Sequence, residues 1–221
     1  MNGDYKIVNY STTPKDSNLI LEYNNDIFNI NIPLTSKFNI YNYLMMFSIL
    51  NQYGISIESL LEKTFFLKSP KGRCETIQIK EGYAVVDYAH TPDAVEKVIS
   101  TYNDLKKGKV ITIIGCGGDR DPKKRPLMGE ISTRLSDYVI ITNDNPRTED
   151  ENNIIKDILS GITKDNYKII NDRRTAIKTG VDMLEKDDIL LVLGKGHENY
   201  QIIGKEKIHF DDVEEIQNYK N

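Results

Sequence analysis

Three short apolar segments of this 221-residue chain each run directly into a polar loop that contains glycine or proline. These segments are residues 110–114, 138–142 and 189–193. Runs of about five aliphatic residues bounded by such loops are typical of buried strands in a parallel sheet. Because the carboxyl ends of parallel strands share one edge of an open α/β sheet, where ligands bind, we expect the three loops to converge there.

Side chains of both charges follow these predicted strands. Arg120 follows the first strand, Asp144 and Arg147 follow the second, and Glu198 follows the third. Guanidinium and carboxylate groups at one edge suit a ligand that carries both carboxylate and ammonium groups. Each loop taken alone can also be a plain turn. The glycines of residues 115–118 are also compatible with a loop that binds phosphate through its backbone N–H groups.

The part of the chain beyond residue 72 alternates strands with helices. A strand is predicted at residues 83–88, and Thr91 followed by Pro92 marks the start of a helix. Further helices are predicted at residues 125–135, 152–162, 173–184 and 211–219, and a closing hairpin at residues 201–203 and 207–210. This alternation predicts an α/β fold with a doubly wound, Rossmann-like, mostly parallel sheet and right-handed crossovers.

The first part of the chain has a different pattern. Short β-rich segments predict strands at residues 5–10, 19–23 and 27–32, and a second helix is expected to start at Ser56. A first helix at residues 38–53 is predicted by apolar residues that recur near a period of 3.6: Phe38, Tyr41, Leu44, Met45, Ile49 and Leu50. Residues 69–72 (Ser-Pro-Lys-Gly) interrupt these patterns. We therefore expect a small α+β domain at residues 1–71 and a larger domain at residues 72–221.

Composition argues against several classes of protein. The formal net charge is -4 and the lysine and arginine clusters are short, so a nucleic-acid-binding surface is not expected. Two cysteines, Cys74 and Cys116, and three histidines show no metal-ligand spacing, so no metal site is predicted in this chain. The absence of a secretory segment, and of an apolar run near about 18 residues, predicts a cytoplasmic protein without membrane insertion.

Four motifs occur in an order that resembles the Mur ligase family, and the resemblance covers about residues 36–221. The motifs are Asp87-Tyr88-Ala89-His90-Thr91-Pro92-Asp93, Gly115-Cys116-Gly117-Gly118-Asp119-Arg120-Asp121, Asp144-Asn145-Pro146-Arg147-Thr148-Glu149 and Gly194-Lys195-Gly196-His197-Glu198. Among the members of that family, the chain most resembles those that add diaminopimelate as the third residue of the cell-wall peptide.

This resemblance implies a reaction. In the family, ATP with Mg²⁺ phosphorylates the glutamate carboxylate of a UDP-N-acetylmuramoyl peptide, and the amine of the incoming amino acid then attacks the acyl phosphate. The implied function is that of an ATP-dependent acid–amino-acid ligase of peptidoglycan biosynthesis. Its implied substrates are meso-diaminopimelate and UDP-N-acetylmuramoyl-L-alanyl-D-glutamate (UDP-MurNAc-dipeptide).

The resemblance also implies which residues bind these ligands. The diaminopimelate contacts carry over onto Arg120, Asp144, Asn145, Pro146, Arg147, Gly194 and Glu198. The nucleotide contacts carry over onto Asn39, Asn42, Arg73, Asp87 and His90. The Asp-Asn-Pro-Arg sequence resembles the form that selects diaminopimelate, because Arg147 can bind a distal carboxylate that lysine lacks. An L-lysine-adding ligase stays open as the alternative within the family.

The sequence departs from the family on its amino-terminal side. It contains no Gly-Lys-Thr or Gly-Lys-Ser phosphate loop, and the family's magnesium ligands and UDP-sugar domain have no counterpart. We therefore expect residues 72–221 to be the family's carboxy-terminal, amino-acid-binding domain and residues 1–71 to be a remnant of its central ATP-binding domain. Such a chain should be inactive unless the missing domains are supplied in trans.

Two alternatives to an active Mur ligase also stay open. One is that the chain is a truncated or split gene product that binds the amino acid without catalysis. It can also be a dinucleotide-binding module, although the spacing of the glycines in residues 115–118 is wrong for that fingerprint.

Overall fold

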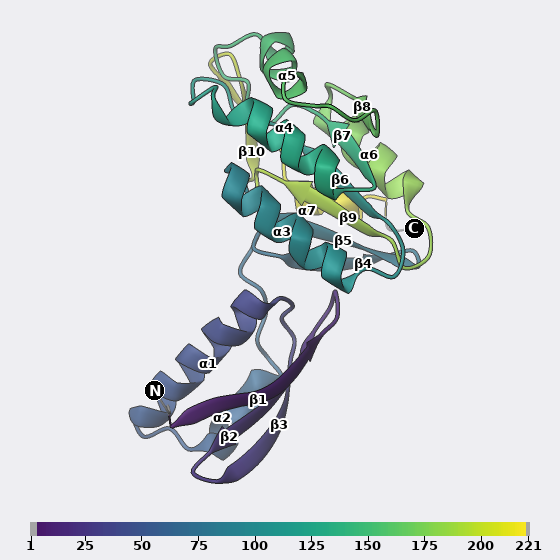
Figure 1. Cartoon of the computed structure of the whole chain (residues 1–221). Coiled ribbons are helices and arrows are strands. Elements are labelled where there is room, and N and C mark those ends of the chain that lie inside the picture. The colour runs from purple at the N-terminus through teal and green to yellow at the C-terminus, as the bar shows by residue number, and fades with distance from the viewer. Residues whose placement is uncertain (1–3, 220–221) are drawn as a thin grey trace. The chain divides into compact units, whose positions relative to one another are not determined.

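The protein forms two compact units, Met1–Ser69 and Pro70–Asn221, in a computed structural model that describes residues 4–219 (Figure 1). The division between the units falls between Ser69 and Pro70. The sequence pattern placed it after residue 71, within the same Ser-Pro-Lys-Gly run.

The first unit is a three-stranded antiparallel sheet with two helices. The strands are β1 (Tyr5–Thr12), β2 (Ser17–Tyr23) and β3 (Asp26–Ile32), in the order β1-β2-β3, and the helices are α1 (Lys37–Gln52) and α2 (Ile57–Thr64). Asn24 and Asn25 form the turn between β2 and β3 with φ angles of 52° and 69°, values that asparagine tolerates better than most residues. The Oγ of Ser56 accepts a hydrogen bond from the Ser59 backbone N–H, which confirms the predicted start of α2.

The buried side of α1 differs from the one that the sequence pattern suggested. Ile40, Tyr43 and Phe47 are the buried residues of the helix, and they pack on the apolar face of the sheet. Four residues of the predicted stripe are about half exposed: Phe38 (54 %), Tyr41 (51 %), Met45 (59 %) and Ile49 (49 %). The helix is apolar on nearly all sides, so its period of 3.6 predicts a helix but does not determine which face is buried.

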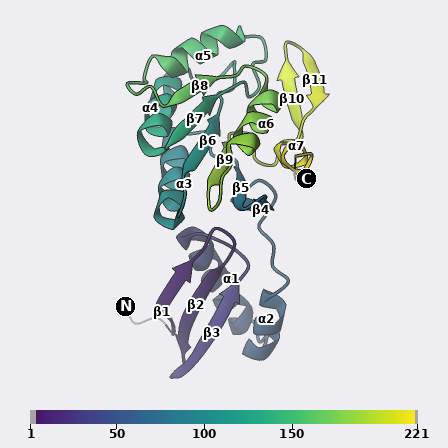
Figure 2. The ribbon, with the colours of Figure 1, turned by 90° about the vertical axis from the view of Figure 1, so that its right-hand side faces the viewer.

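The second unit is built on a six-stranded, mostly parallel sheet with the strand order β4-β5-β9-β6-β7-β8 (Figure 2). All neighbouring pairs are parallel except β4 with β5, which is antiparallel. The strands are β4 (Glu75–Ile79), β5 (Gly82–Asp87), β6 (Val110–Ile114), β7 (Tyr138–Ile141), β8 (Tyr167–Ile169) and β9 (Ile189–Leu193). The predicted doubly wound α/β fold is thereby confirmed. The sequence analysis missed the two edge strands, β4 and β8.

Helices cover both faces of this sheet. One face packs against α3 (Pro92–Leu105), α4 (Lys124–Leu135) and α5 (Glu151–Leu159), and the other packs against α6 (Arg173–Met183) and α7 (Asp212–Gln217). Neighbouring strand residues alternate between the two cores, so that Val85 belongs to the first and Val86 to the second. The hairpin of β10 (Tyr200–Ile203) and β11 (Glu206–His209) lies between β9 and α7 in the sequence.

Arg173, in the first turn of α6, is buried and connects three parts of the second unit. Its Nε and Nη2 atoms donate to the Asp212 carboxylate of α7 at 2.8 and 2.7 Å. Its Nη1 and Nη2 atoms also donate to the carbonyls of Asn143 (3.3 Å) and Leu193 (3.1 Å), at the ends of β7 and β9. Burial, the largest single cause, would lower the pKa of Arg173, but the nearby carboxylates, with Asp212 foremost, together outweigh burial and raise it. The guanidinium therefore stays charged and ties two strand ends to α7.

Arg125 of α4 connects the loops that follow β6 and β7. Its Nη2 donates to the Gly117 carbonyl (3.2 Å) and to the Glu149 carboxylate (2.9 Å), and its Nη1 donates to Asp157 (2.9 Å). Glu149 also accepts a hydrogen bond from the backbone N–H of Asp119. The hydrogen bond from Arg125 is the largest cause that lowers the pKa of Glu149 below its ordinary value. The two loops are therefore held together through one ionised carboxylate.

Replacing Arg173 by methionine should lower the free energy of unfolding of the second unit by about 3–5 kcal/mol, because Asp212 would stay buried without its partner. Urea unfolding followed by circular dichroism measures this change. Lys178→Met, on the same helix, removes a half-exposed ion pair with Asp182 and should cost at most about 1 kcal/mol. Equal losses in the two variants would contradict the role given to Arg173.

The stability of the second unit should depend on pH through Glu149. A carboxylate with a lowered folded-state pKa stabilises the fold above its unfolded pKa of about 4.3, and this stabilisation is lost as the pH falls through the folded-state pKa. Between about pH 7 and about pH 3, the melting temperature of Glu149→Gln should therefore fall less than that of the original chain. The melting temperature of the control variant Glu206→Gln, at an exposed glutamate, should fall as much as that of the original chain. Identical pH profiles for all three proteins would refute this assignment.

Candidate functional site

An open cavity of about 510 Å³ lies at the carboxyl edge of the parallel sheet. The loops that follow β5, β6, β7 and β9 meet there, together with α4 and β10. Its lining comprises Tyr88, His90, Thr91, Gly115, Cys116, Gly117, Arg120, Asp121, Lys124, Met128, Asp144, Asn145, Arg147, Gly194, Glu198 and Tyr200. The three polar loops singled out in the sequence therefore converge on one place.

Most of the residues predicted to bind an amino acid line this cavity. These are Arg120, Asp144, Asn145, Arg147, Gly194 and Glu198. Pro146 is buried and is not among the lining residues. Its carbonyl lies so close to Gly118 that a Cβ built there would be 1.9 Å away, which explains the glycine at that position. Pro146 thus shapes the loop and does not face the cavity.

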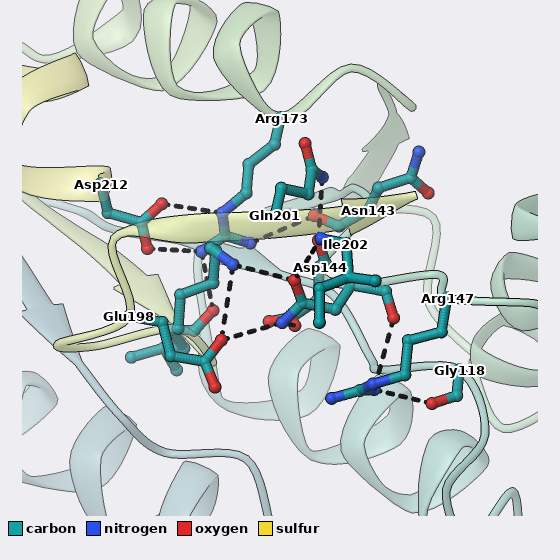
Figure 3. Close-up of polar contacts among 12 residues, drawn as sticks. Gly118, Asn143, Asp144, Arg147, Arg173, Glu198, Gln201, Ile202 and Asp212 are labelled. Atoms are coloured by element: carbon teal, nitrogen blue, oxygen red, sulfur yellow. Dashed lines mark hydrogen bonds and ion pairs between the residues drawn. The ribbon is translucent and has the colours of Figure 1, made fainter. Parts of the chain in front are cut away.

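Arg147 is held from both its backbone and its side chain. Its φ of 53° is in the left-handed region, and its backbone N–H donates to the carbonyl of Ile202 at 3.0 Å. Its carbonyl accepts from the N–H of Gly204 at 2.7 Å, so the β10–β11 hairpin fixes the residue. Its Nη1 donates to the carbonyl of Gly118 at 2.7 Å (Figure 3). The guanidinium is thus positioned by two neighbouring loops.

Arg120 is held much less firmly. The residue is exposed, and its Nη1 donates to the carbonyl of the adjacent Asp119 at 3.0 Å. The Asp119 carboxylate accepts hydrogen bonds from the Oγ1 and the backbone N–H of Thr148, and these bonds lower its pKa. The Asp119 carboxylate therefore links the loop after β6 to the loop after β7, while Arg120 is one of the residues that line the cavity.

The side chain of Asn145 joins the acids of the site. Its Nδ2 donates to Asp144 Oδ1 at 3.0 Å and to Glu198 Oε2 at 2.8 Å. Its Oδ1 accepts from the backbone N–H of Ile202 at 2.9 Å and from Lys195 Nζ at 3.3 Å. Two carboxylates from different loops are thereby linked through one amide.

Lys195 is a residue of the site that the sequence analysis quoted in a motif but gave no role. It follows β9 and has an exposed fraction of 0 %. Burial is the main cause that lowers its pKa, and the carboxylate of Asp144 opposes this shift. Its position between two glycines directly after a buried strand was the one sequence signal for a role in the site. This signal is weak, because lysines in loops are usually solvated.

Gly194 has a backbone conformation that explains its residue type. Its φ of 112° is rarely adopted by other residues, and a Cβ built on it would lie 2.6 Å from Asp144 Oδ2. Its N–H donates to the carbonyl of Asp87 at 3.1 Å. The glycine therefore lets the carboxylate of Asp144 approach the backbone of the neighbouring loop.

Three of the residues predicted to contact a nucleotide lie near the end of β5. The Asp87 carboxylate accepts from the backbone N–H groups of Cys74 and Ala89, both at 2.8 Å, and so fixes the chain on either side of the strand. His90 lines the cavity, and its Nδ1 is 2.8 Å from the carbonyl of Tyr88. The guanidinium of Arg73 lies 4.9 Å from the centroid of the Tyr88 ring.

The other two predicted nucleotide contacts, Asn39 and Asn42, lie on α1 of the first unit. The Nδ2 of Asn39 donates to the carbonyl of Thr35 at 2.8 Å, and Asn42 is exposed. Their spacing of three residues places both side chains on the same side of the helix.

Three further observations concern the described residues. Cys116 is buried against Met128, and burial raises the pKa of its thiol to about 12, so the thiol is not a nucleophile at neutral pH. Between residues 4 and 219, His, Cys, Asp and Glu form no group of three that could bind a metal ion. None of the helices in that range is long and apolar enough to span a bilayer.

Comparison with known proteins finds relatives that are similar in sequence and in fold. The UDP-N-acetylmuramoyl-L-alanyl-D-glutamate–2,6-diaminopimelate ligase 1 of Clostridium acetobutylicum is 43% identical over 98% of this chain and 46% of its own length. The ligase of the same name from Fusobacterium nucleatum is 44% identical over 97% of this chain and 43% of its own length. A solved structure of a UDP-N-acetylmuramoyl-L-alanyl-D-glutamate–2,6-diaminopimelate ligase is 36% identical, with a TM-score of 0.78 over 99% of this chain and 45% of its own.

A more distant solved structure shares only the fold. Folylpolyglutamate synthase from Thermotoga maritima is 21% identical, with a TM-score of 0.68 over 86% of this chain and 44% of its own. This chain therefore spans less than half the length of the relatives it matches. The family model of the Mur ligase glutamate ligase domain matches residues 72–196. Because this match covers more than half of the sequence, the chain belongs to the Mur ligase family.

Proposed function

We propose that this chain is the amino-acid-binding portion of a ligase that adds meso-diaminopimelate to UDP-N-acetylmuramoyl-L-alanyl-D-glutamate. The observation that carries the proposal is the convergence of Arg120 and Arg147 with Asp144 and Glu198 on one cavity. Relatives that cover nearly all of this chain bear the name of that ligase, which supports the same assignment. The proposal includes a cytoplasmic location, because the nucleotide-linked substrates of such a reaction belong to that compartment.

The proposal assigns a different part of the enzyme to each unit. Residues 72–221 correspond to the carboxy-terminal domain with the amino-acid site, and residues 1–71 to the last part of a central ATP-binding domain. The family match from residue 72 to residue 196 supports the first assignment. Asn39 and Asn42 in the first part, and Arg73, Asp87 and His90 in the second, are the proposed nucleotide contacts.

The cavity can bind both kinds of charged group that diaminopimelate carries. The two guanidinium groups suit its two carboxylates, because a planar guanidinium can donate two parallel hydrogen bonds to a carboxylate. The carboxylates of Asp144 and Glu198 suit its ammonium groups. Bound in this way, the amino acid would be held with its reacting amine in a fixed direction, which is the main contribution that positioning makes to such a reaction.

The described residues do not form a complete site for ATP and Mg²⁺. The sequence lacks a Gly-Lys-Thr or Gly-Lys-Ser loop, and residues 4–219 contain no metal-binding group of three acids, histidines or cysteines. We therefore assign no step of phosphoryl transfer to the side chains of this chain. Their part is to bind and orient the amino acid and to contact the nucleotide.

Replacing Arg147 by alanine should weaken the binding of meso-diaminopimelate by about 2–5 kcal/mol, because a hydrogen-bonded charge pair would be lost. The binding of L-lysine should change little, because lysine has no distal carboxylate. Isothermal titration calorimetry with both amino acids measures the difference. If the variant lost equal affinity for the two amino acids, the proposal that Arg147 binds the distal carboxylate would be wrong.

Arg134→Ala provides the matched control for that experiment. Arg134 lies on α4, is about half exposed, and pairs with Glu96 and Glu130 away from the cavity lining. This variant should bind both amino acids as the original chain does. A chain that binds L-lysine more tightly than meso-diaminopimelate would identify the lysine-adding alternative.

The purified chain should form no UDP-MurNAc-tripeptide by itself from ATP, UDP-MurNAc-dipeptide and meso-diaminopimelate, because its residues supply no phosphate loop. Chromatographic detection of the tripeptide tests this expectation. The full-length ligase of Clostridium acetobutylicum serves as the positive control. If the purified chain made the tripeptide without a second protein, the claim that it lacks a working phosphate site would be wrong.

A further inference from the structure

We propose that Lys195 is a positioning residue of the cavity, whose ammonium group fixes the Asn145 amide and the Glu198 carboxylate from behind the cavity wall. The inference rests on the proposed function, because it concerns how the same site recognises the ammonium groups of its amino acid. It adds a residue that does not touch the ligand itself and acts through the side chains that do.

The position of Lys195 excludes direct contact with a ligand in the cavity. Its exposed fraction is 0 %, and it is not one of the residues that line the cavity, whereas Asn145 and Glu198 are. Its Nζ lies 3.3 Å from Asn145 Oδ1, 3.5 Å from Glu198 Oε2 and 5.6 Å from the centroid of the Tyr200 ring. A buried ammonium in this position interacts with the lining side chains and not with the solvent.

The hydrogen bonds of Asn145 show what this ammonium determines. An asparagine side chain has two donor hydrogens on nitrogen and two acceptor sites on oxygen, and all four are used here. The oxygen faces two groups that can only donate, Lys195 Nζ and the Ile202 N–H. The nitrogen faces two carboxylates, Asp144 and Glu198. A flipped amide would point donors at donors and acceptors at acceptors, so only one orientation is possible.

This orientation aligns the two acids. Each of the two carboxylates gives one oxygen to Asn145, namely Asp144 Oδ1 and Glu198 Oε2, and the second oxygen of each takes no part in these bonds. Without the ammonium of Lys195, the amide would be held on its oxygen side by the Ile202 N–H. The amide would then lose one of its two bonds on oxygen, and Glu198 would lose the ammonium beside it, so the two carboxylates would be held less firmly.

The charges of the cluster agree with a site for ammonium groups. Lys195 and Arg173 contribute two positive charges, and Asp144, Glu198 and Asp212 contribute three negative ones, which leaves a net charge of 2 − 3 = −1. Arg173 makes its two shortest bonds to Asp212. Lys195 and Arg173 thus both face the carboxylates of Asp144 and Glu198, but only Lys195 is within hydrogen-bond distance of Glu198, and the cluster keeps an excess of one negative charge.

The test is calorimetric titration of the full chain with meso-diaminopimelate. Lys195→Met should bind about ten- to a hundredfold more weakly, the range known for removing the outer partners of metal ligands. Lys195→Arg, which keeps the charge and the donors, should recover part of the lost affinity. Lys205→Met, at an exposed lysine in the β10–β11 turn, should bind normally. Normal binding by Lys195→Met would overturn the proposal.

A second measurement needs no ligand. In nitrogen-15 spectra of the original chain, the side-chain amide protons of Asn145, assigned with an Asn145→Ser spectrum, should exchange slowly with water. In Lys195→Met they should exchange at least about tenfold faster while the backbone spectrum stays folded, a change that general packing by Lys195 would not produce. Unchanged exchange in that variant would also overturn the proposal.

The outcomes separate this inference from the proposed function. If the original chain does not bind meso-diaminopimelate, the proposed function fails, and the ligand-aligning role of Lys195 fails with it. If the original chain binds and Lys195→Met binds equally well, only the inference fails. Should Lys195→Met not fold, Lys195→Gln replaces it, and rapid exchange of the Asn145 amide in the original chain would by itself contradict the proposal.

Discussion

The ion pair between Arg173 and Asp212 is the contact on which the carboxyl edge of the sheet depends. Backbone hydrogen bonds align parallel strands, but the carbonyls at the strand ends must find other donors or solvent. Arg173 supplies donors to Asn143 and Leu193, at the ends of two strands, and Asp212 fixes the guanidinium that supplies them. The loops that carry the site therefore leave the sheet from fixed points. This arrangement explains how a cavity formed mostly by loops can hold its side chains in defined positions.

The sequence predicted those strands whose residues are buried on both faces. All five residues of β6 and of β9 are buried, and such strands must be continuous aliphatic runs, which can be recognised without an alignment. The edge strands β4 and β8 are partly exposed and contain polar residues, so they lack that signal. The face of α1 was also beyond prediction, because burial there depends on the sheet against which Ile40, Tyr43 and Phe47 pack.

The candidate site was predictable as far as its loops, but not as far as its internal hydrogen bonds. The order of strands and polar loops brought Arg120, Asp144, Arg147 and Glu198 to one edge, where the structure has them. The position of Lys195 between two glycines after a buried strand is too weak a signal to predict its burial, because its contacts come from Asn145 after β7, Glu198 after β9 and Tyr200 of β10. The pairing of Arg173 with Asp212 is a contact of the same kind, between residues 39 positions apart.

The two arginines of the cavity differ in how much freedom they would lose on binding a ligand. Arg147 already has a fixed backbone and a side chain anchored on Gly118, so a carboxylate bound there costs little additional ordering. Arg120 is exposed. Within the described residues, its side chain makes one hydrogen bond, to the carbonyl of its neighbour Asp119, so ordering this side chain would cost more. A rigid group discriminates between ligands better than a mobile one, because it cannot move to accommodate a wrong shape. On the proposed function, we therefore expect the wall formed by Arg147, Asn145 and Glu198 to select the ligand, and Arg120 to adapt to it.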